Sequence, residues 1–183
     1  MAQKNITRHR IPELRRGTEA KSNDPYISKR GMKEPAKCNI CQSVYHHKRW
    51  YLKDDPIAME LQDHSMQLTV CPACRKSREH YPEGVITLRG EYLITQKKEI
   101  LNLVRNEETR AKENNPLERI ISIKEVEKTI EIQTTSERLA ERIGKEVKRA
   151  FGGRVTFHWN HGDKMVRVEW SREPEKEKKK SKK

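Results

Sequence analysis

The sequence predicts an α+β protein with a small four-cysteine zinc ribbon, a C-terminal ββαββ domain and basic, disordered termini. The four cysteines form two C-x2-C pairs with none left over, and residues 116–172 alternate between strand and helix patterns. Hydrophobic residues are 33% of the chain and charged residues 37%, which is too little apolar material for one large core. The expected segments are a basic flexible arm (1–36), the zinc ribbon (37–81), a connector with a helix (82–115), the ββαββ domain (116–172) and a Lys/Glu-rich tail (173–183).

The N-terminal arm is polar and basic, and its few apolar residues follow no clean period. Such a segment cannot bury enough apolar surface to order on its own. We interpret it as an extension that follows an RNA backbone. A solvated tail is the alternative.

The two cysteine pairs are Cys38/Cys41 and Cys71/Cys74. This spacing is typical of a structural zinc site, because a two-residue spacer lets both sulfurs of a pair face one tetrahedral metal. Two disulfides would require an oxidising compartment, and an iron–sulfur cluster would use the same ligands. Four thiolates leave no open position for water or substrate. We therefore predict one structural Zn²⁺ held by all four cysteines.

The predicted ribbon has two zinc knuckles, one at each cysteine pair, and a short strand leads into each of them. Residues 44–51 are rich in β-formers and aromatics and suit a strand or hairpin, and residues 66–70 alternate as a strand before the second pair. Residues 57–61 predict an extra loop or helical turn. Trp50 is either a base-stacking residue or a cover for the metal.

The connector begins with a turn at Pro82 and Gly84, followed by a short buried segment at Val85, Ile86 and Leu88. Residues 94–112 have apolar positions at helical spacing and charged residues on the opposite side. We expect a helix that covers its neighbours only in part.

The ββαββ domain is the most regular part of the chain. Residues 119–126, 129–135, 154–159 and 165–170 predict four strands of a largely antiparallel sheet. For the first of these segments, a helix that starts at Leu117 is the alternative. Ser136 predicts the N-cap of a helix that runs to Phe151, and Gly152-Gly153 predicts its end. The matching apolar faces are expected on the following residues: Leu139, Ala140, Ile143, Val147, Ala150 and Phe151 on the helix, and Val155, Phe157, Trp159, Val166, Val168 and Trp170 on the last two strands.

The charge of the chain is strongly positive, at +13. Four thiolates and one zinc ion contribute a net −2, which leaves about +11. Such a balance favours a polyanionic partner. No apolar run approaches the length of a bilayer span and no signal-peptide core follows Met1, so we expect a cytoplasmic protein without a membrane partner.

Basic residues at three places are predicted to contact RNA: after the first cysteine pair, after the second pair, and at helical spacing on the outer side of the 137–151 helix. The alternative for this helix is a solvated face laced with glutamates. The predicted contacts are Lys48, Arg49, Trp50, Arg75, Lys76, Arg78, Arg138, Arg142, Lys145 and Arg149.

Three stretches resemble the Nmd-three family, the adaptors of the large ribosomal subunit in archaea and eukaryotes. These are the cysteine pairs, the segment Tyr81–Gly90 (YPEGVITLRG), similar to the family's Tyr-x-Glu-x-x-x-x-Leu-Arg element, and the strand–helix unit 130–153. The resemblance implies that the four cysteines bind metal, that Arg89 is a possible RNA contact, and that the partner is ribosomal or other structured RNA. This chain lacks the further cysteine hooks that the family uses for a second metal.

The sequence thus predicts a non-enzymatic, zinc-binding protein that binds structured RNA. The favoured partner is ribosomal RNA or a ribosomal subunit. A DNA-binding or transcription-associated zinc ribbon is the alternative function. No Ser–His–Asp set, phosphate-binding glycine loop or His-x-Glu pattern occurs, so we expect neither an enzyme nor a small-molecule substrate.

Overall fold

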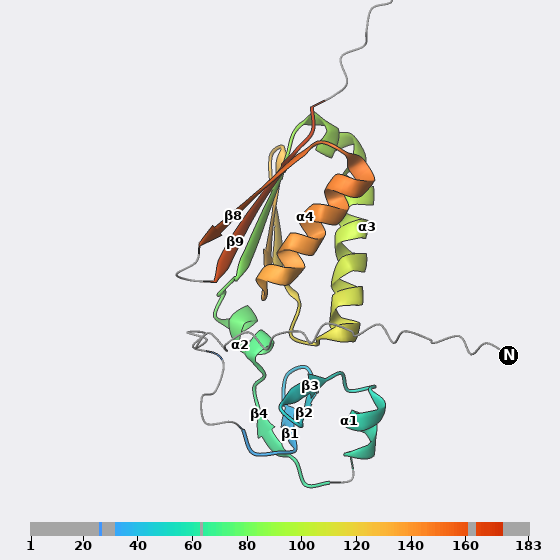
Figure 1. Ribbon diagram of the computed structural model, residues 1–183, viewed down its shortest axis with the longest axis vertical. Helices are drawn as coiled ribbons and strands as arrows, with labels where there is room; N and C mark the ends of the chain where they lie inside the picture. Colours follow the sequence, from blue (N-terminus) through green and yellow to red (C-terminus); the bar gives the residue numbers. More distant parts are fainter. Residues whose placement is uncertain (1–25, 27–31, 63, 161–163, 174–183) are drawn as a thin grey trace, which may run out of the picture.

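The computed structural model describes residue 26 and residues 32–62, 64–160 and 164–173. It is an α+β structure with two sheets, which belong to two modules that follow each other along the long axis (Figure 1). We call residues 32–81 the cysteine module and residues 82–173 the sheet module. Most of the predicted arm (1–36) and of the predicted tail (173–183) lies outside the described residues.

The cysteine module contains a sheet in the order β3-β2-β1-β4, in which β1 and β4 are parallel. Its strands are β1 (Ala36–Cys38), β2 (Val44–His46), β3 (Arg49–Tyr51) and β4 (Gln67–Thr69), and its helices are α1 (Pro56–Glu60) and α2 (Pro72–Arg78). The predicted hairpin, strand and helical turn are therefore all present. Asp55 caps α1 by accepting a hydrogen bond from the Ile57 N–H at 2.9 Å.

The β2–β3 hairpin turns at His47 and Lys48, which both have positive φ, as a two-residue type I′ turn requires. The carboxylate of Glu34 accepts hydrogen bonds from the N–H groups of His47 and Lys48, at 2.6 and 3.0 Å. These bonds hold the turn in a conformation that non-glycine residues adopt rarely.

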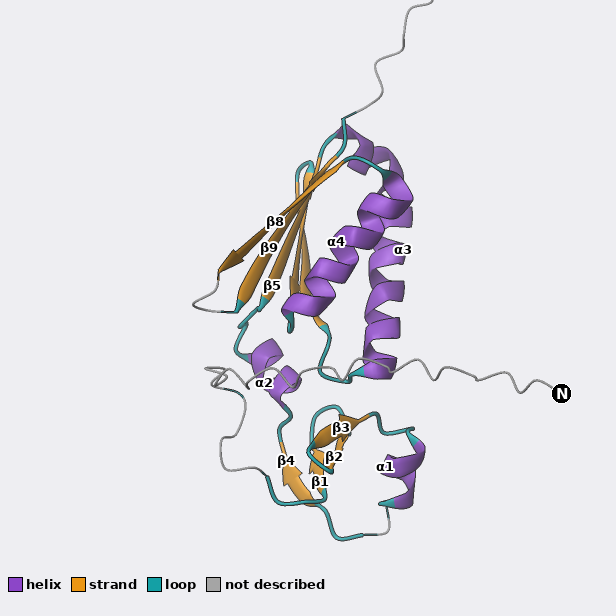
Figure 2. Ribbon diagram, in the orientation of Figure 1, coloured by secondary structure: helices purple, strands orange, loops and turns teal. Residues whose placement is uncertain are grey.

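The sheet module contains a five-stranded sheet in the order β6-β7-β5-β9-β8. Its elements are β5 (Gly84–Arg89), α3 (Glu91–Asn114), β6 (Ile120–Val126), β7 (Thr129–Thr134), α4 (Glu137–Phe151), β8 (Arg154–Asn160) and β9 (Met165–Ser171). Neighbouring strands are antiparallel except for β5 and β9, which are parallel. Both long helices lie on the same side of the sheet (Figure 2).

This architecture corrects the expected four-stranded ββαββ domain. The segment expected to be a connector (82–115) supplies the central strand β5 and a second covering helix, α3. Ile86 and Leu88 of β5 are fully buried, because they lie opposite Ile132 and Ile130 of β7 on one side and Val168 and Trp170 of β9 on the other. The apolar alternation of β5 is a local signal, but its position at the centre depends on pairing with strands that are distant in sequence.

The predicted start and end of α4 are confirmed, whereas Ala150 and Trp159, expected on the matching apolar faces, are exposed. Ser136 Oγ accepts a hydrogen bond from the Leu139 N–H at 3.2 Å, and α4 ends at Gly152, whose φ is 67°. A Cβ at Gly144 would lie 2.5 Å from Val168 Cγ1, so this glycine lets α4 approach the sheet closely. The core fills the space between the sheet and the two helices, and its largest fully buried side chain is Trp170.

Candidate metal centre

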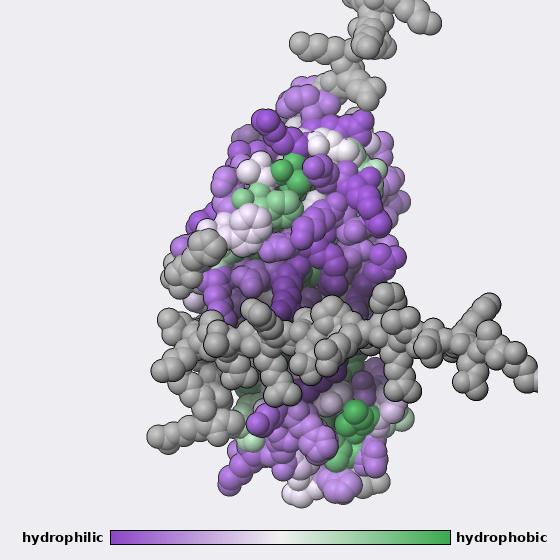
Figure 3. All heavy atoms as spheres, in the orientation of Figure 1, coloured by the Kyte–Doolittle hydropathy of each residue, from purple (hydrophilic) through white to green (hydrophobic). Residues whose placement is uncertain are grey.

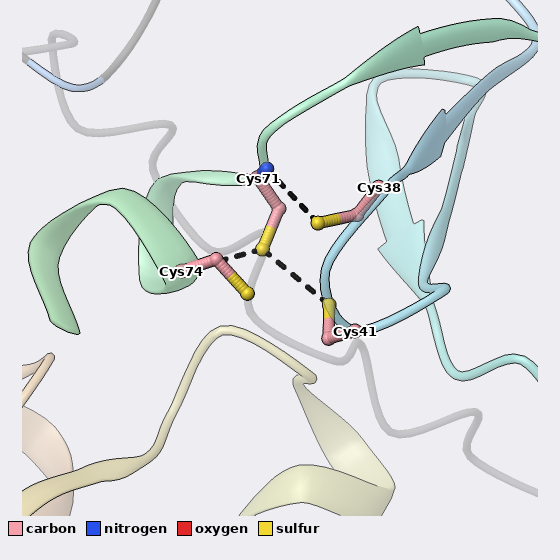
Figure 4. Close-up of side chains that lie close together, drawn as sticks. All are labelled: Cys38, Cys41, Cys71 and Cys74. Carbon is pink, nitrogen blue, oxygen red and sulfur yellow. Dashed lines mark hydrogen bonds between the residues drawn. The ribbon is translucent and has the colours of Figure 1, made fainter. Parts of the chain in front are cut away.

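The sulfur atoms of Cys38, Cys41, Cys71 and Cys74 all lie within 4.8 Å of one another. The four side chains converge from two segments of the cysteine module (Figure 4). Three of the cysteines are buried, Cys41 is half-buried, and none forms a disulfide. The predicted set of ligands is therefore brought together in one cluster.

The first pair sits in a tight turn that follows β1. The Cys38 N–H donates to the Ser43 carbonyl at 2.8 Å, and the Gln42 N–H donates to the Cys38 carbonyl at 3.0 Å. The Asn39 N–H donates to the Thr69 carbonyl at 2.9 Å, which ties this turn to the end of β4. Because β4 leads directly into the second pair, this bond sets the distance between the two pairs.

The second pair lies at the start of a helix, which corrects the expected ribbon of two knuckles. Cys71 is the N-cap of α2, and its Sγ accepts a hydrogen bond from the Cys74 N–H at 3.4 Å. Pro72 occupies the first turn, where its missing N–H costs nothing. Proline after a capping residue is a helix-start signal, so this helix could have been predicted from the sequence.

The geometry fits a tetrahedral metal with four thiolate ligands. Zinc–sulfur bonds of about 2.3 Å place neighbouring sulfurs about 3.8 Å apart. Cys41 Sγ and Cys71 Sγ are separated by 3.7 Å. The Cys71 N–H also donates to Cys38 Sγ at 3.4 Å, as backbone amides do around thiolates. Four soft thiolates in this arrangement could fill all four positions of a tetrahedral metal ion.

Arg119 of the sheet module completes the surroundings of the cysteines. Its Nη2 donates to Cys41 Sγ at 3.2 Å and its Nη1 donates to Cys74 Sγ at 3.5 Å. Arg119 is held in turn by Nε, which donates to the Pro116 carbonyl at 2.6 Å, and by its own N–H, which donates to Thr135 Oγ1 at 2.8 Å. Its charge lies against the net negative charge that four thiolates and one divalent metal would carry.

The sequence pattern does not single out Arg119 as a residue of the metal centre. It lies 45 residues from Cys74 and 78 residues from Cys41. Nothing in its local pattern distinguishes it from the other arginines, since the contact depends on how the start of β6 meets the cysteine module.

Without metal, the thiols differ strongly in acidity. The hydrogen bond from Cys71 lowers the pKa of Cys41 to about 3, and the same bond, together with burial, raises the pKa of Cys71. Burial raises the pKa of Cys74 to about 11. Burial lowers the pKa of Arg119, but its hydrogen bond to Cys41 and the nearby thiolate charges outweigh this and leave its pKa raised. A cluster with protonated thiols must release protons when it binds a metal.

Trp50 belongs to the shell around the cysteines rather than to a surface that could bind RNA. It is 6% exposed and packs with Cys38, Cys71 and Cys74. Its ring lies 5.3 Å from that of Tyr45, at 51°. The alternative considered for Trp50, a cover for the metal, is therefore the one that fits its position.

The three basic residues predicted to contact RNA after the second cysteine pair differ in their exposure to solvent. Lys76 is 5% exposed and forms an ion pair with Glu83 at 2.5 Å, which links α2 to the segment before β5. Arg75 is half-buried with its guanidinium 6.0 Å from the Tyr26 ring, and Arg78 is exposed beside Glu79. Lys76 is therefore a buried, paired residue, whereas Arg75 and Arg78 stay candidates for RNA contact.

The basic residues predicted to contact RNA from the β2–β3 hairpin and from β5 are exposed. Lys48 lies at the tip of the β2–β3 turn. The neighbouring Arg49 donates from Nη2 to the Asn114 carbonyl at the end of α3, at 3.0 Å, so it joins the two modules. Arg89 lies on the sheet face opposite the helices. These residues stay candidates for RNA contact, although they do not form one patch with α4.

The predicted cationic row on α4 is largely paired with glutamates, which was the alternative considered for it. Arg142 is half-buried and approaches Glu118 at 3.4 Å and Glu107 at 3.7 Å, so it holds α4 to α3 and to the segment before β6. Lys145 pairs with Glu141 at 3.1 Å and Arg149 with Glu146 at 2.5 Å. Arg138 is exposed and has no ion-pair partner among the described residues.

Comparison with models of protein families, with curated proteins and with solved structures finds no match to this chain. Among the described residues, no helix has the length and apolar character needed to cross a membrane.

Proposed function

We propose that this chain is a non-enzymatic RNA-binding protein whose cysteine module is stabilised by one structural zinc ion. Cys38, Cys41, Cys71 and Cys74 would hold the metal. Its chemistry there is to cross-link four thiolates and to offset half of their negative charge. The partner we propose is structured RNA, in particular ribosomal RNA or a ribosomal subunit, in keeping with the resemblance to the Nmd-three family.

The observation that carries this proposal is the net charge of +13. Polyanions are the partners that such a charge favours, and contacts between lysine or arginine and phosphate supply most of the affinity in non-specific nucleic-acid binding. Lys48, Arg89 and Arg138 add exposed cations from three elements, none with an ion-pair partner among the described residues. A rigid scaffold that presents separated cations suits a folded RNA with phosphates on several sides.

Sedimentation of a cell lysate through sucrose gradients, at low and at moderate salt, tests the proposed partner. We expect the protein to travel with a ribosomal subunit at low salt and to leave it as the salt rises, because counterion release weakens phosphate contacts. A protein that stays at the top of both gradients contradicts the ribosomal partner.

Filter binding with purified protein separates RNA from DNA. We compare a labelled, structured RNA with duplex DNA of equal length between about 50 and about 200 mM salt. Tighter binding to the RNA, with a steep fall in affinity over this range, supports the proposal. Preference for the DNA favours a DNA-binding zinc protein, and a flat salt response contradicts a phosphate-based interface of either kind.

A further inference from the structure

An aromatic pair lies at the outer edge of the sheet module. The rings of Phe157 and Trp159 on β8 are stacked, with centroids 5.6 Å apart and an angle of 21° between the planes. Trp159 is 50% exposed, whereas Trp50 and Trp170 are 6% and 1% exposed. In Figure 3, a patch of pale and green spheres interrupts the hydrophilic surface between β8 and α4.

The exposure of Trp159 follows from the topology. Trp159 is on the sheet face that carries the helices, as predicted, and lies opposite the buried Val166 of β9. However, β8 is an edge strand, and α4 packs mainly over β9 and β5, where Gly144 and Gly84 allow close approach. The helix therefore leaves the outer end of β8 uncovered, and a side chain with the pattern of a core residue remains at the surface.

The indole of Trp159 is nevertheless held in place. Its Nε1–H donates to Glu141 of α4 at 2.9 Å, and Glu141 also accepts from Lys145 Nζ at 3.1 Å. Lys145 Nζ lies 5.9 Å from the centre of the Phe157 ring. The polar atom of the indole is thus satisfied inside the protein. A ligand that meets the exposed part of the ring does not have to order a mobile side chain first.

We propose that Trp159 and Phe157 form a platform on which unpaired bases of RNA stack. This inference rests on the proposed RNA-binding function and names a site for it. Aromatic side chains that stack on bases, flanked by cations that contact the backbone, are the usual means of binding single-stranded nucleic acid.

Charge favours RNA over a protein partner at this platform. Lys148 lies one turn beyond Lys145 on the same side of α4, is exposed, and has no ion-pair partner among the described residues. Lys148 is therefore positioned to contact a phosphate, and the excess positive charge of the whole chain acts in the same direction.

Fluorescence anisotropy of the full chain with fluorescein-labelled single-stranded RNA of about 12 nucleotides tests the platform. We expect Trp159→Ala to weaken binding about 5- to 100-fold, and Trp159→Phe to retain part of the affinity because a ring remains. In Trp159→Ala, the slope of log affinity against log salt should be unchanged, since no phosphate contact is lost. In Lys148→Ala, the slope should become shallower by about 0.7, because one phosphate contact is lost.

The matched control is Leu68→Ala, which removes another large exposed apolar side chain, 68% exposed, from the cysteine module. Circular dichroism confirms that each variant is folded. If the wild-type protein binds the RNA and Trp159→Ala binds as tightly as Leu68→Ala, the platform is overturned while the proposed function stands, and the patch is then a surface for a protein partner. If the wild-type protein binds the structured RNA but not this single strand, the platform alone is overturned. If it binds neither RNA at low salt, both proposals fall.

Discussion

In the cysteine module, three of the five residues of the buried cluster are cysteines, whereas the sheet module buries aliphatic side chains and Trp170 between one sheet face and two helices. The four strands of the cysteine module are each three residues long. The strands of the sheet module have six or seven residues and pair in register along most of their length. The two modules therefore exclude water from their interiors by different means.

This difference indicates what each module needs in order to fold. A module of about 50 residues cannot bury enough apolar surface to offset its conformational entropy, so a metal or disulfides usually supply the missing stability. The sheet module has a continuous core and helix caps at both ends of α4. We expect the cysteine module to depend on metal and the sheet module to be independent of it.

The largest expected effect follows from breaking the cysteine cluster. Cys74→Ser removes one of four thiolates, and structural zinc sites have apparent binding free energies of about 10–16 kcal/mol. We expect residues 36–81 to lose amide protection in hydrogen-exchange mass spectrometry, while β5 to β9, α3 and α4 keep theirs. Cys38→Ser should behave in the same way.

Ser77→Ala, on the same helix as Cys74, is the control and should leave both modules protected. Retained protection of the cysteine module in Cys74→Ser would show that its short strands are stable alone. Loss of protection in both modules would show that the sheet module also depends on the metal. Either outcome contradicts the distinction between the modules.

The same distinction explains how much could be predicted from the sequence. The caps of α4 at Ser136 and Gly152, the alternation of β7, β8 and β9, and the spacing of the cysteines are signals carried by neighbouring residues, and the structure confirms each of them. Steric and hydrogen-bonding preferences act over a few residues, so they can be recognised without knowing the fold.

The errors concern contacts between residues far apart in the chain. The connector became the centre of the sheet because Ile86 meets Ile132 and Val168. In sequence, Lys76 and Arg142 resemble the other basic residues of the surface. Only the fold places Glu83 beside Lys76, and Glu107 and Glu118 beside Arg142. No local pattern distinguishes a lysine or arginine that contacts RNA from one that joins two elements.

Arg119 tests how strongly the two modules are joined. Arg119→Ala removes hydrogen bonds to Cys41 and Cys74, and the loss of such outer contacts typically lowers metal affinity about 10- to 100-fold. Competition with a chromophoric zinc chelator measures this affinity. Arg119→Lys should rescue it only in part, because an ammonium cannot reproduce a planar group that donates to two sulfurs at once.

Arg105→Ala is the matched control, since Arg105 is exposed on α3 with no ion-pair partner among the described residues. Equal zinc affinity in Arg119→Ala and the wild-type protein would mean that the cysteine module holds its metal without help from the sheet module. The zinc affinity of the cysteine module would then be independent of the sheet module.

The smallest expected effect concerns Glu141, which lies on α4 of the sheet module. Its hydrogen bond from Trp159 lowers the pKa of Glu141 below the ordinary value of 4.5, and the bond from Lys145 acts in the same direction against the effect of burial. A carboxyl group with a lowered pKa in the folded state stabilises the fold above its unfolded pKa, and this stabilisation is lost as the pH falls through the folded pKa. The bond to Trp159 should therefore be intact at neutral pH and should break only below about pH 4.5.

The indole N–H resonance of Trp159 in ¹⁵N-labelled protein reports this bond directly. We expect it to shift with pH below the ordinary glutamate range and to lose that transition in Glu141→Gln. A midpoint at or above 4.5 would contradict the lowered pKa of Glu141. Because Trp159 belongs to the sheet module, the same transition should occur in Cys74→Ser, in which the cysteine module cannot hold its metal. A transition that disappears in Cys74→Ser would mean that the edge strand β8 depends on the metal after all.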